Sequence, residues 1–579
     1  MEILRPHLQR YWQEIVGAVL AVIVAAITAL WQPHLLQAVL NAILTNDSVL
    51  VKHYGIELIV VALIGILAGV ANVFFAARLA QGVTSDLREE TYRKIQTFSF
   101  GNIEHFSSGS LVVRLINDMN QITNFVMTLV MQLIRVPVLF VGSFILGVVT
   151  IPRLWWVEVS LITIIILVAY FIFKRMGALF ERVQTYMDKV NLQVKEELQG
   201  IRVVKSFNQE GKQQADFNQT SEQLNQVDLV IGYLFSASFP AFTLVSYLGV
   251  ALAIYLVAQT VTIHPQEIAA LSAYITYLTI LTMAIIIGGM TSMAFSRGLV
   301  SLGRIKEVLV TKPDVEFEQS GFKGKLQGNV TFKEVSFAYP DAKEGDLSLA
   351  DISFQVQAGQ MIGIVGATGA GKSTLAQLIA RLYDPTTGTI EIDGHDLKTL
   401  SEETLRQTVS FVLQKALLFS GTIESNLKQG KYDATSEELE RAIGIAQAAE
   451  FVNRYQEGLS HEIEERSANL SGGQKQRLSI ARGVVGQPPV LILDDSTSAL
   501  DAKSEKLVQE ALAKHLQNTT TFIIAEKIVS VLKADQILVL DQGRLVAKGT
   551  HQELLASSPL YQEIYASQKA KERMVAVDD

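Results

Sequence analysis

A nine-residue run in the second half of the chain has the residue types and spacing of a phosphate-binding loop. It follows the short apolar stretch Met361–Val365 and leads into an apolar helical stretch. In such a loop, glycines let successive backbone N–H groups converge on phosphate oxygens, the lysine reaches the terminal phosphates and the serine hydroxyl ligates Mg²⁺. The sequence therefore predicts binding of a nucleoside triphosphate with Mg²⁺. The loop consists of Gly366, Ala367, Thr368, Gly369, Ala370, Gly371, Lys372, Ser373 and Thr374.

A carboxylate follows a second apolar strand. Val490–Leu493 ends in Asp494, which places an acid at the strand tip, where the Mg²⁺ held by Ser373 is expected to lie. Tyr339 precedes the core strands and could stack on a base, although a single tyrosine in such a place is more often structural.

The elements that position these residues belong to a separate domain. After about residue 315, long apolar runs give way to alternating strand and helix patterns, which indicate a soluble α/β P-loop ATPase domain over 316–579. Before it, residues 1–315 are predicted to form a polytopic α-helical membrane domain with six transmembrane helices. Each span has the roughly 20 apolar residues that cross a bilayer core of about 30 Å. The spans are expected near 13–32, 56–79, 124–149, 155–174, 229–259 and 268–295.

Lysine and arginine set the orientation of these spans. The excursions 80–123 and 174–228 are rich in both, whereas the outer loops hold only Lys52 and Arg153. By the positive-inside rule, both termini are expected in the cytoplasm of a multi-pass protein of the plasma membrane, in contact with membrane lipids.

Composition agrees with this division and narrows the function. A mean hydropathy of +0.28 is high for a chain of 579 residues that is soluble throughout. The net charge of -8 gives no electrostatic case for nucleic acid, and without cysteine there is neither a disulfide nor a thiolate metal site.

One ionised residue lies inside the third expected span. Arg135 either lines a polar substrate path or packs against neighbouring helices, bonded to carbonyls or to an acid such as Glu158. Likewise, the aromatic and methionine side chains of the last two spans either line a cavity for a drug or pack against helices and lipid.

The segment Leu470–Gln474 reads LSGGQ, and here the chain resembles the ABC (ATP-binding cassette) ATPases. With six spans upstream, it resembles a half-transporter of the type IV exporter group. The resemblance implies that Tyr339 stacks on adenine, that Gln414 is a catalytic-site residue and Mg²⁺ ligand, and that segments near 98–118 and 200–214 contact the ATPase domains, one in cis and one in trans. It also implies a D-loop at Ser498–Asp501, an exporter X-loop at Glu464–Ser467, and nucleotide contacts in a partner's site from Ser471, Gly472, Gly473 and Gln474.

Two positions depart from the family pattern. The base that polarises the attacking water is usually a glutamate, and Asp495 is one methylene shorter. The switch position usually holds a histidine that contacts the γ-phosphate. Here Glu526 would repel that phosphate unless it is neutral, turned away or offset by Lys527.

An intact signature beside a damaged base and switch is similar to the degenerate-site subunit of bacterial heterodimeric multidrug exporters. The resemblance implies ATP-driven efflux of amphipathic drugs or lipids, with slow hydrolysis at this chain's own site and a second half-transporter as partner. Two alternatives are a lipid or peptide exporter, and a regulatory subunit that ATP gates while hydrolysis is vestigial.

Overall fold

The computed structural model describes residues 3–260, 266–318, 320–343, 345–498 and 500–575. Two compact units form: Met1–Gln96 with Gly109–Thr311, and Thr97–Ser108 with Lys312–Asp579. The short segment Thr97–Ser108 therefore packs with the C-terminal unit, although it interrupts the N-terminal one.

The first unit is helical and supplies six helices, or helix pairs, that are long and apolar enough to cross a membrane. Its helices are α1 (Leu4–Arg10), α2 (Trp12–Leu44), α3 (Ser48–Gln96), α5 (Ser108–Val113), a π-helical turn (Arg114–Asp118), α6 (Met119–Gln132), α7 (Arg135–Thr150), a 3₁₀ turn (Pro152–Leu154), α8 (Trp155–Gln199), α9 (Ile201–Ser206), α10 (Glu210–Ala258) and α11 (Glu267–Val310). Each of the six expected spans falls within one of these helices, except that the third lies across α6 and α7 and the fifth, 229–259, extends one residue beyond α10. The prediction of a six-span membrane domain is thus confirmed.

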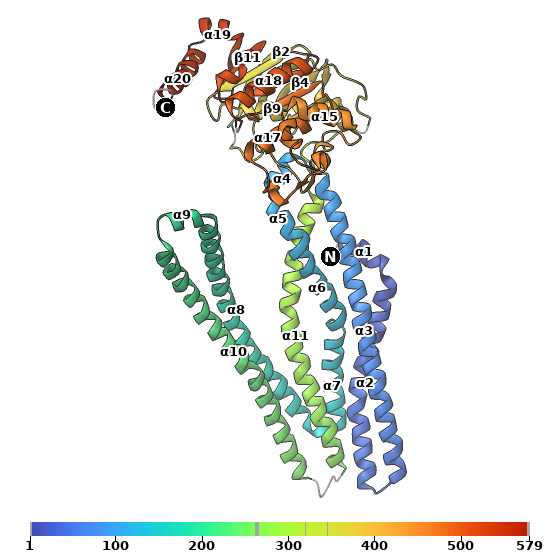
Figure 1. Cartoon of the computed structure of the whole chain (residues 1–579). Coiled ribbons are helices and arrows are strands. Elements are labelled where there is room, and N and C mark those ends of the chain that lie inside the picture. Colours follow the sequence, from blue (N-terminus) through green and yellow to red (C-terminus); the bar gives the residue numbers. More distant parts are fainter. Residues whose placement is uncertain (1–2, 261–265, 319, 344, 499, 576–579) are drawn as a thin grey trace. The chain divides into compact units, whose positions relative to one another are not determined.

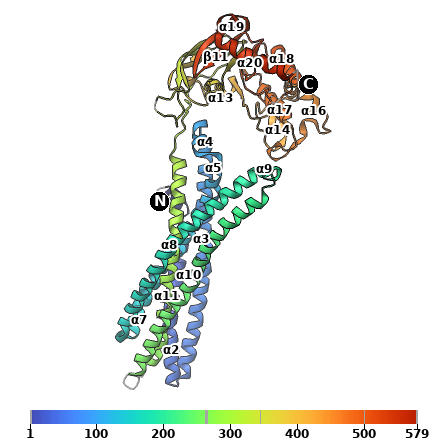
Figure 2. The ribbon, with the colours of Figure 1, turned by 90° about the vertical axis from the view of Figure 1, so that its left-hand side faces the viewer.

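Several spans continue well beyond the bilayer thickness. Helices α8 and α10 run side by side, and α9 joins their ends at a distance from α3 and α11 (Figures 1 and 2). The described residues of α9 include none that is buried. Hydroxyl groups inside the bundle bond to backbone carbonyls: Tyr274 Oη donates to Leu154 O and Tyr277 Oη to Leu30 O, both at 3.0 Å.

The third span is broken where the hydropathy pattern is continuous. Helix α6 ends at Gln132 and α7 begins at Arg135. Pro137 explains the break, because its nitrogen carries no hydrogen and its ring crowds the carbonyl of Leu133, four residues earlier.

The second unit is built on a six-stranded sheet in the order β12-β11-β3-β10-β9-β6. A four-stranded antiparallel sheet, β2-β1-β4-β5, and the pair β7-β8 complete the strands of this unit in the described part of the chain. The strands are β1 (Val330–Phe337), β2 (Leu349–Val356), β3 (Met361–Gly366), β4 (Thr387–Ile392), β5 (His395–Asp396), β6 (Val409–Val412), β7 (Gly421–Thr422), β8 (Glu462–Ile463), β9 (Val490–Asp494), β10 (Thr520–Ile524), β11 (Gln536–Asp541) and β12 (Arg544–Gly549).

Both faces of the large sheet are buried, as expected for parallel strands between helices. In β9, Leu491 and Leu493 pack in one core while Val490 and Ile492 pack in the other. Residues of α15, α17 and α18 belong to the first core, and those of α12 and the antiparallel sheet belong to the second. The helices of this unit are α4 (Phe100–Phe106), α12 (Lys372–Ile379), α13 (Glu402–Thr408), α14 (Ile423–Leu427), α15 (Ser436–Ile445), α16 (Ala449–Val452), α17 (Gly472–Val484), α18 (Ala502–His515), α19 (His551–Ser557) and α20 (Pro559–Val575).

Candidate nucleotide site

Strand register brings the residues that were predicted to bind nucleotide and Mg²⁺ to one edge of the large sheet. Ile524 of β10 pairs in parallel with Ile364 of β3 on one side and with Asp494 of β9 on the other. The carboxyl ends of these strands therefore meet, and the phosphate-binding loop, Asp495 and Glu526 all follow directly. On the far side of β9, Val412 of β6 pairs with Leu493, so Gln414 arrives at the same edge.

A cavity of about 680 Å³ opens there. Among the residues expected from the sequence, its walls include Tyr339, Thr368, Gly369, Gly371, Lys372, Ser373, Thr374, Gln414, Asp494, Asp495 and Glu526. Gly366, Ala367 and Ala370 belong to the same loop but do not line the cavity.

The loop has the backbone that its glycines allow. Gly371 has φ +94°, a left-handed conformation, and a Cβ there would lie 2.7 Å from the Leu349 side chain. Gly366 is equally constrained, because a Cβ would lie 2.2 Å from the carbonyl oxygen of Leu540. The loop is thus held close to its neighbours, and a side chain at either position would displace it.

The Lys372 side chain contacts the backbone of its own phosphate-binding loop. Its Nζ donates to the carbonyl oxygens of Gly366 and Ala367, each at 2.9 Å. Burial lowers the pKa of its ammonium group, and the negative charges of Glu526, Asp494 and Asp495 oppose that shift. A cation among carboxylates at a phosphate-binding loop is well placed to meet the terminal phosphates of a nucleotide.

The residues expected to hold Mg²⁺ lie together and offer the oxygen ligands that it prefers. Ser373 Oγ donates to Asp494 Oδ1 at 3.0 Å, and Gln414 Nε2 donates to Asp495 Oδ2 at 3.1 Å, so that the Gln414 amide oxygen stays free to accept. Burial raises the pKa of Asp494, and the Ser373 hydroxyl opposes this rise. The donor set fits Mg²⁺, which would neutralise phosphate charge there.

The two departures from the family pattern face the same cavity. Asp495 has φ +45°, and its backbone N–H donates to Ile524 O at 3.0 Å, which holds it at the end of β9. Glu526 is exposed, two residues beyond β10, and its backbone carbonyl accepts from Gln568 Nε2 at 2.7 Å. Lys527, weighed as a possible offset for Glu526, does not line the cavity.

Tyr339 lies at the wall with its hydroxyl bonded. It is 3.0 Å from Thr374 Oγ1 and donates to Gln377 Oε1 at 2.9 Å, and its ring meets that of Tyr383 edge-on with centroids 5.3 Å apart. Burial raises the pKa of Tyr339.

The signature residues lie elsewhere in the unit. Ser471 caps α17: its N–H donates to Gln474 Oε1 at 2.8 Å, and Gln474 N–H donates to Ser471 Oγ at 3.3 Å. Gly472 has open space around it. None of Ser471, Gly472, Gly473 and Gln474 lines the cavity of Lys372, so this helix start is available to another molecule.

Two further motifs named from the resemblance lie beside these elements. In the expected D-loop, Ser498 Oγ donates to Asp495 O at 3.0 Å, Asp501 caps α18, and Ala499 lies outside the described residues. In the expected X-loop, Arg466 and Ser467 both have positive φ.

Other residues of the cavity were missed by sequence reasoning. All of them except Ile524, the last residue of β10, come from the β1–β2 and β11–β12 loops, which carry no motif. Gly543 N–H donates to Ala370 O at 3.3 Å and so fastens the second loop to the phosphate-binding loop. A short polar turn between two apolar strands is the one signal that could have located it. The missed residues are Asp346, Leu347, Ser348, Ile524, Gln542 and Gly543.

The segment Thr97–Ser108 is bonded to this ATPase unit. Tyr383 Oη donates to Glu104 Oε2 at 2.6 Å, and Asn102 Nδ2 donates to Lys312 O at 3.2 Å. Since Tyr383 also packs against Tyr339, a short chain of contacts joins α4 to the wall of the cavity.

Six long apolar helices joined to a P-loop ATPase unit with a separate LSGGQ helix define an ATP-driven membrane transporter. Comparison with known proteins agrees with this class. Residues 15–285 match the family model of the ABC transporter transmembrane region, and residues 349–498 match the family model described as ABC transporter. The chain therefore belongs to the ABC transporter family.

Relatives match nearly the whole chain. It is 36% identical over 544 residues to the uncharacterized ABC transporter ATP-binding protein YfiB of Bacillus subtilis, and this alignment covers 94% of each chain. It is 31% identical over 578 residues, 98% of each chain, to the uncharacterized ABC transporter ATP-binding protein Rv1273c of Mycobacterium tuberculosis. A bacterial Atm1-family ABC exporter solved with ATP bound has a TM-score of 0.79 and 26% identity over 97% of this chain and 98% of its own.

These findings make the chain a multi-pass ABC exporter half-transporter, whose ATPase domain binds ATP, generally with Mg²⁺, and couples its hydrolysis to transport. Such exporters work as dimers within membrane lipid.

Proposed function

We propose that this chain is the degenerate-site subunit of a heterodimeric exporter that moves amphipathic drugs or lipids, hydrophobic small molecules, across the plasma membrane. The observation that carries the proposal is that Asp495 and Glu526 face the cavity of Lys372, while the Ser471–Gln474 signature is intact and open. In this arrangement the chain holds ATP in its own site and supplies a competent signature to the site of its partner.

Nucleotide binding and hydrolysis depend on different residues. Lys372, Ser373 and Asp494 keep the chemistry that binds nucleotide and Mg²⁺. A general base must come within about 3 Å of the proton that it removes, and a carboxylate one methylene short does not reach it. We therefore expect tight binding with slow turnover in this site.

The competent site of the pair joins the partner's P-loop and base to this chain's Ser471 and Gly472. Their hydroxyl and N–H groups are the donors that stabilise charge on a transferring γ-phosphate. Loss of one preorganised donor costs on the order of a hundredfold in rate. In the purified pair, Gly472→Asp is expected to come close to abolishing hydrolysis, whereas Asp495→Asn should leave most of it. Equal loss in the two variants would mean that Asp495 is a working base, and the proposal would then fail.

Topology completes the proposal. We place both termini in the cytoplasm, the domain boundary near residue 315, and the excursions 80–123 and 174–228 on the cytoplasmic side, because of their basic residues. The chain has no cysteine, so single introduced cysteines can be labelled with an impermeant reagent. Labelling from outside at a cysteine near residue 210 would contradict this orientation.

A further inference from the structure

A second cavity in the membrane-helix unit is lined by residues of α2, α6, α7 and α11. Figure 1 labels these four helices. Its volume is about 230 Å³. Arg135 and Gln132 contribute its charged and amide groups. The remaining lining, apart from Ala29, Thr279 and Ala284, consists of Val136, Leu139, Ile280, Met283 and Ile287.

Arg135 has no counter-charge there. No hydrogen bond or ion pair joins it to any residue that the structure describes, so among those residues it bonds neither to a backbone carbonyl nor to an acid. Glu158 in particular is buried against Gly147, 12 positions along the helix from Arg135, or about 18 Å at 1.5 Å per residue.

The other acids on the lining helices are equally remote. Glu14 in α2 and Asp118, just before α6, lie 15 and 14 positions from the nearest cavity residues, Ala29 and Gln132, which is about 22 and 21 Å along a helix. Glu267 and Glu307 of α11 lie 12 and 20 positions from its nearest cavity residues, about 18 and 30 Å.

Arg135 also lies at membrane depth. It is 15 residues from the outer end of α7 at Thr150, or about 22 Å, and Met283 is 16 residues from the start of α11 at Glu267, or about 24 Å. Both distances fall inside a hydrocarbon core of about 30 Å. A guanidinium group stays ionised in proteins, so at this depth it requires water or an anion.

The lining fits a ligand with two parts. The guanidinium group can donate two parallel hydrogen bonds to a carboxylate, sulfonate or phosphate, and the Gln132 amide, which has no bonded partner among the described residues, can add a third. The aliphatic and methionine side chains accept an apolar body. The small volume suits a compact acidic group, with the apolar part extending past the mouth of the cavity.

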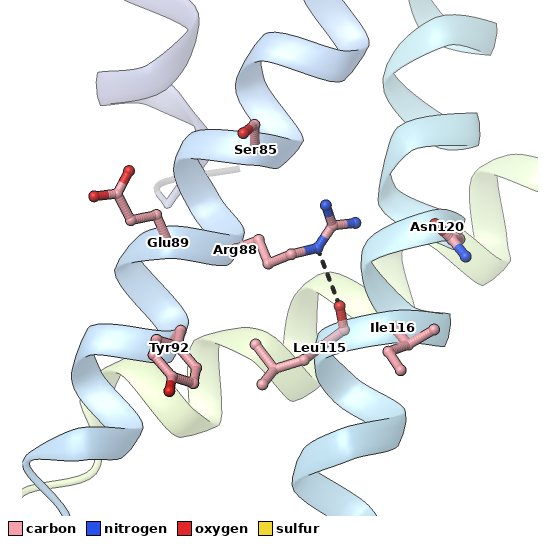
Figure 3. A pocket seen from close by; sticks show the side chains of 7 residues that line it. All are labelled: Ser85, Arg88, Glu89, Tyr92, Leu115, Ile116 and Asn120. Carbon is pink, nitrogen blue, oxygen red and sulfur yellow. Dashed lines mark hydrogen bonds between the residues drawn. The ribbon is translucent and has the colours of Figure 1, made fainter. Parts of the chain in front are cut away.

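A larger cavity in the same unit lacks these properties. In the cavity of about 520 Å³ drawn in Figure 3, Arg88 Nε donates to Leu115 O at 3.2 Å, and the carboxylate of Glu89 shares the wall. Arg88 already donates one hydrogen bond to a carbonyl oxygen, and the negative charge of Glu89 would repel an anionic ligand.

We propose that the cavity around Arg135 binds the acidic group of an anionic amphiphile, and that Arg135 and Gln132 select this class of substrate. The inference rests on the proposed export function, since the ligand is taken to be the exported molecule. Its acid is supplied either by a free amphiphile or by the headgroup of a membrane lipid.

The test uses the co-purified pair in phosphatidylcholine nanodiscs and two fluorescent probes, 11-(dansylamino)undecanoate and its methyl ester. The wild type is expected to bind the acid more tightly than the ester. Arg135→Gln should weaken acid binding about tenfold and leave ester binding unchanged, because the two charge-assisted bonds from the guanidinium group are lost and the glutamine amide can replace at most one of them with a neutral bond. Arg135→Lys should restore part of the preference. Arg78→Gln is the matched control: Arg78 of α3 is exposed, as Arg135 is, but it stacks over Phe74 and does not line the cavity, so both affinities should stay at wild-type values.

Equal acid affinities in wild type and Arg135→Gln would overturn the inference. So would failure of Arg135→Gln to assemble with the partner while Arg78→Gln assembles, because Arg135 would then serve the subunit interface.

Nanodiscs containing phosphatidylglycerol separate the two sources of the acidic group. If this lipid competes with the acid probe, and the competition requires Arg135, the ligand is a lipid headgroup. If the lipid does not compete, the ligand is a free amphiphile. ATP-driven uptake of both probes into vesicles tests export separately. If ATP moves neither probe while acid binding still depends on Arg135, the proposed export function is refuted and the proposed binding site is supported. If ATP moves the ester but binding of the acid does not depend on Arg135, the proposed binding site is refuted and the proposed export function is supported.

Discussion

Restoring the two departed residues should restore hydrolysis at this chain's own site. The perturbation is Asp495→Glu with Glu526→His in the full-length chain, purified without a partner. In a dimer of two copies, the family resemblance implies that the Lys372 loop of one would meet the Ser471 signature of the other. We expect the double variant to hydrolyse ATP about a hundredfold faster than the wild type, because a misplacement of about 1 Å in a catalytic group can cost that factor.

The magnitude follows from the contacts of the two residues. The Asp495 carboxylate accepts from Gln414 Nε2 at 3.1 Å, so an added methylene advances it by about 1.5 Å, and the exposed Gln414 side chain must turn aside. Glu526 acts through charge. Two unit charges 4 Å apart interact by about 1 kcal/mol in water, which is the appropriate limit for an exposed group. Glu526→His alone should therefore tighten ATP binding by about fivefold, with little gain in rate.

Single-turnover hydrolysis of radiolabelled ATP in nanodiscs measures the rate, after light scattering has shown that the chain is dimeric. Adding Ser471→Ala to the double variant is the control, and it should remove the gain. The reasoning is refuted if the wild type already hydrolyses ATP as fast as the double variant and Lys372→Ala abolishes both rates.

Three further predictions concern packing and pH. A Cβ on Gly147 would lie 2.0 Å from Glu158 Oε1, so Gly147→Ala should lower the Tm by several degrees, and adding Glu158→Ala should recover it; thermal unfolding in detergent would measure both, and no recovery would contradict the contact. Tyr383→Phe keeps the ring and loses the bond to Glu104, which should lower unfolding stability by about 1 kcal/mol, with no further loss in the double variant with Glu104→Gln. For Asp393, burial acts to raise the pKa, but hydrogen bonds from the 327–329 backbone and side chain outweigh it and lower the pKa. Its stabilisation is therefore present above its ordinary pKa of about 4 and is lost as the pH falls through the lower folded value, so the Tm deficit of Asp393→Ala should be constant from about pH 5 to 8 and shrink in more acidic buffer.

Those parts of the ATPase unit that have local signals could be predicted from the sequence. The phosphate-binding loop combines a strand, glycines and a helix within one continuous segment, and Asp494 ends an apolar run. By contrast, Gln542 and Gly543 reach the cavity only because β11 pairs with β3, and nothing in their own segment indicates that pairing. The general rule is that strand register, a tertiary property, decides which loops share an edge.

The membrane half divides in the same way. Hydropathy predicted the six spans, because the bilayer imposes a minimum length on each. Hydropathy alone could not predict that Thr97–Ser108 packs with the ATPase unit, since the partners of Asn102 and Glu104 are Lys312 and Tyr383, more than 200 positions away. Only the family resemblance indicated a contact with an ATPase domain near 98–118. The break before Arg135 has a local cause, Pro137. An averaged hydropathy does not reveal it, and a proline alone does not predict a break because membrane helices tolerate proline.

Binding and chemistry in an ATP site tolerate error differently, and this difference is the physical basis for a degenerate subunit. Affinity is distributed over the backbone of Gly366–Thr374, Lys372 and the oxygens of Ser373 and Asp494, and each hydrogen bond contributes on the order of 1 kcal/mol. Shortening one side chain outside that set changes the affinity little. The rate depends on a single base placed to within a fraction of an ångström, so under the proposed function we expect the loss of one methylene at Asp495 to lower the rate of hydrolysis by orders of magnitude. A single substitution can thus convert an ATPase site into one that holds ATP, while Ser471–Gln474, on a separate helix, continues to serve the opposite site. Since bound nucleotide stabilises whichever state binds it, a slow site of this kind keeps the closed dimer populated for longer than the active site alone would.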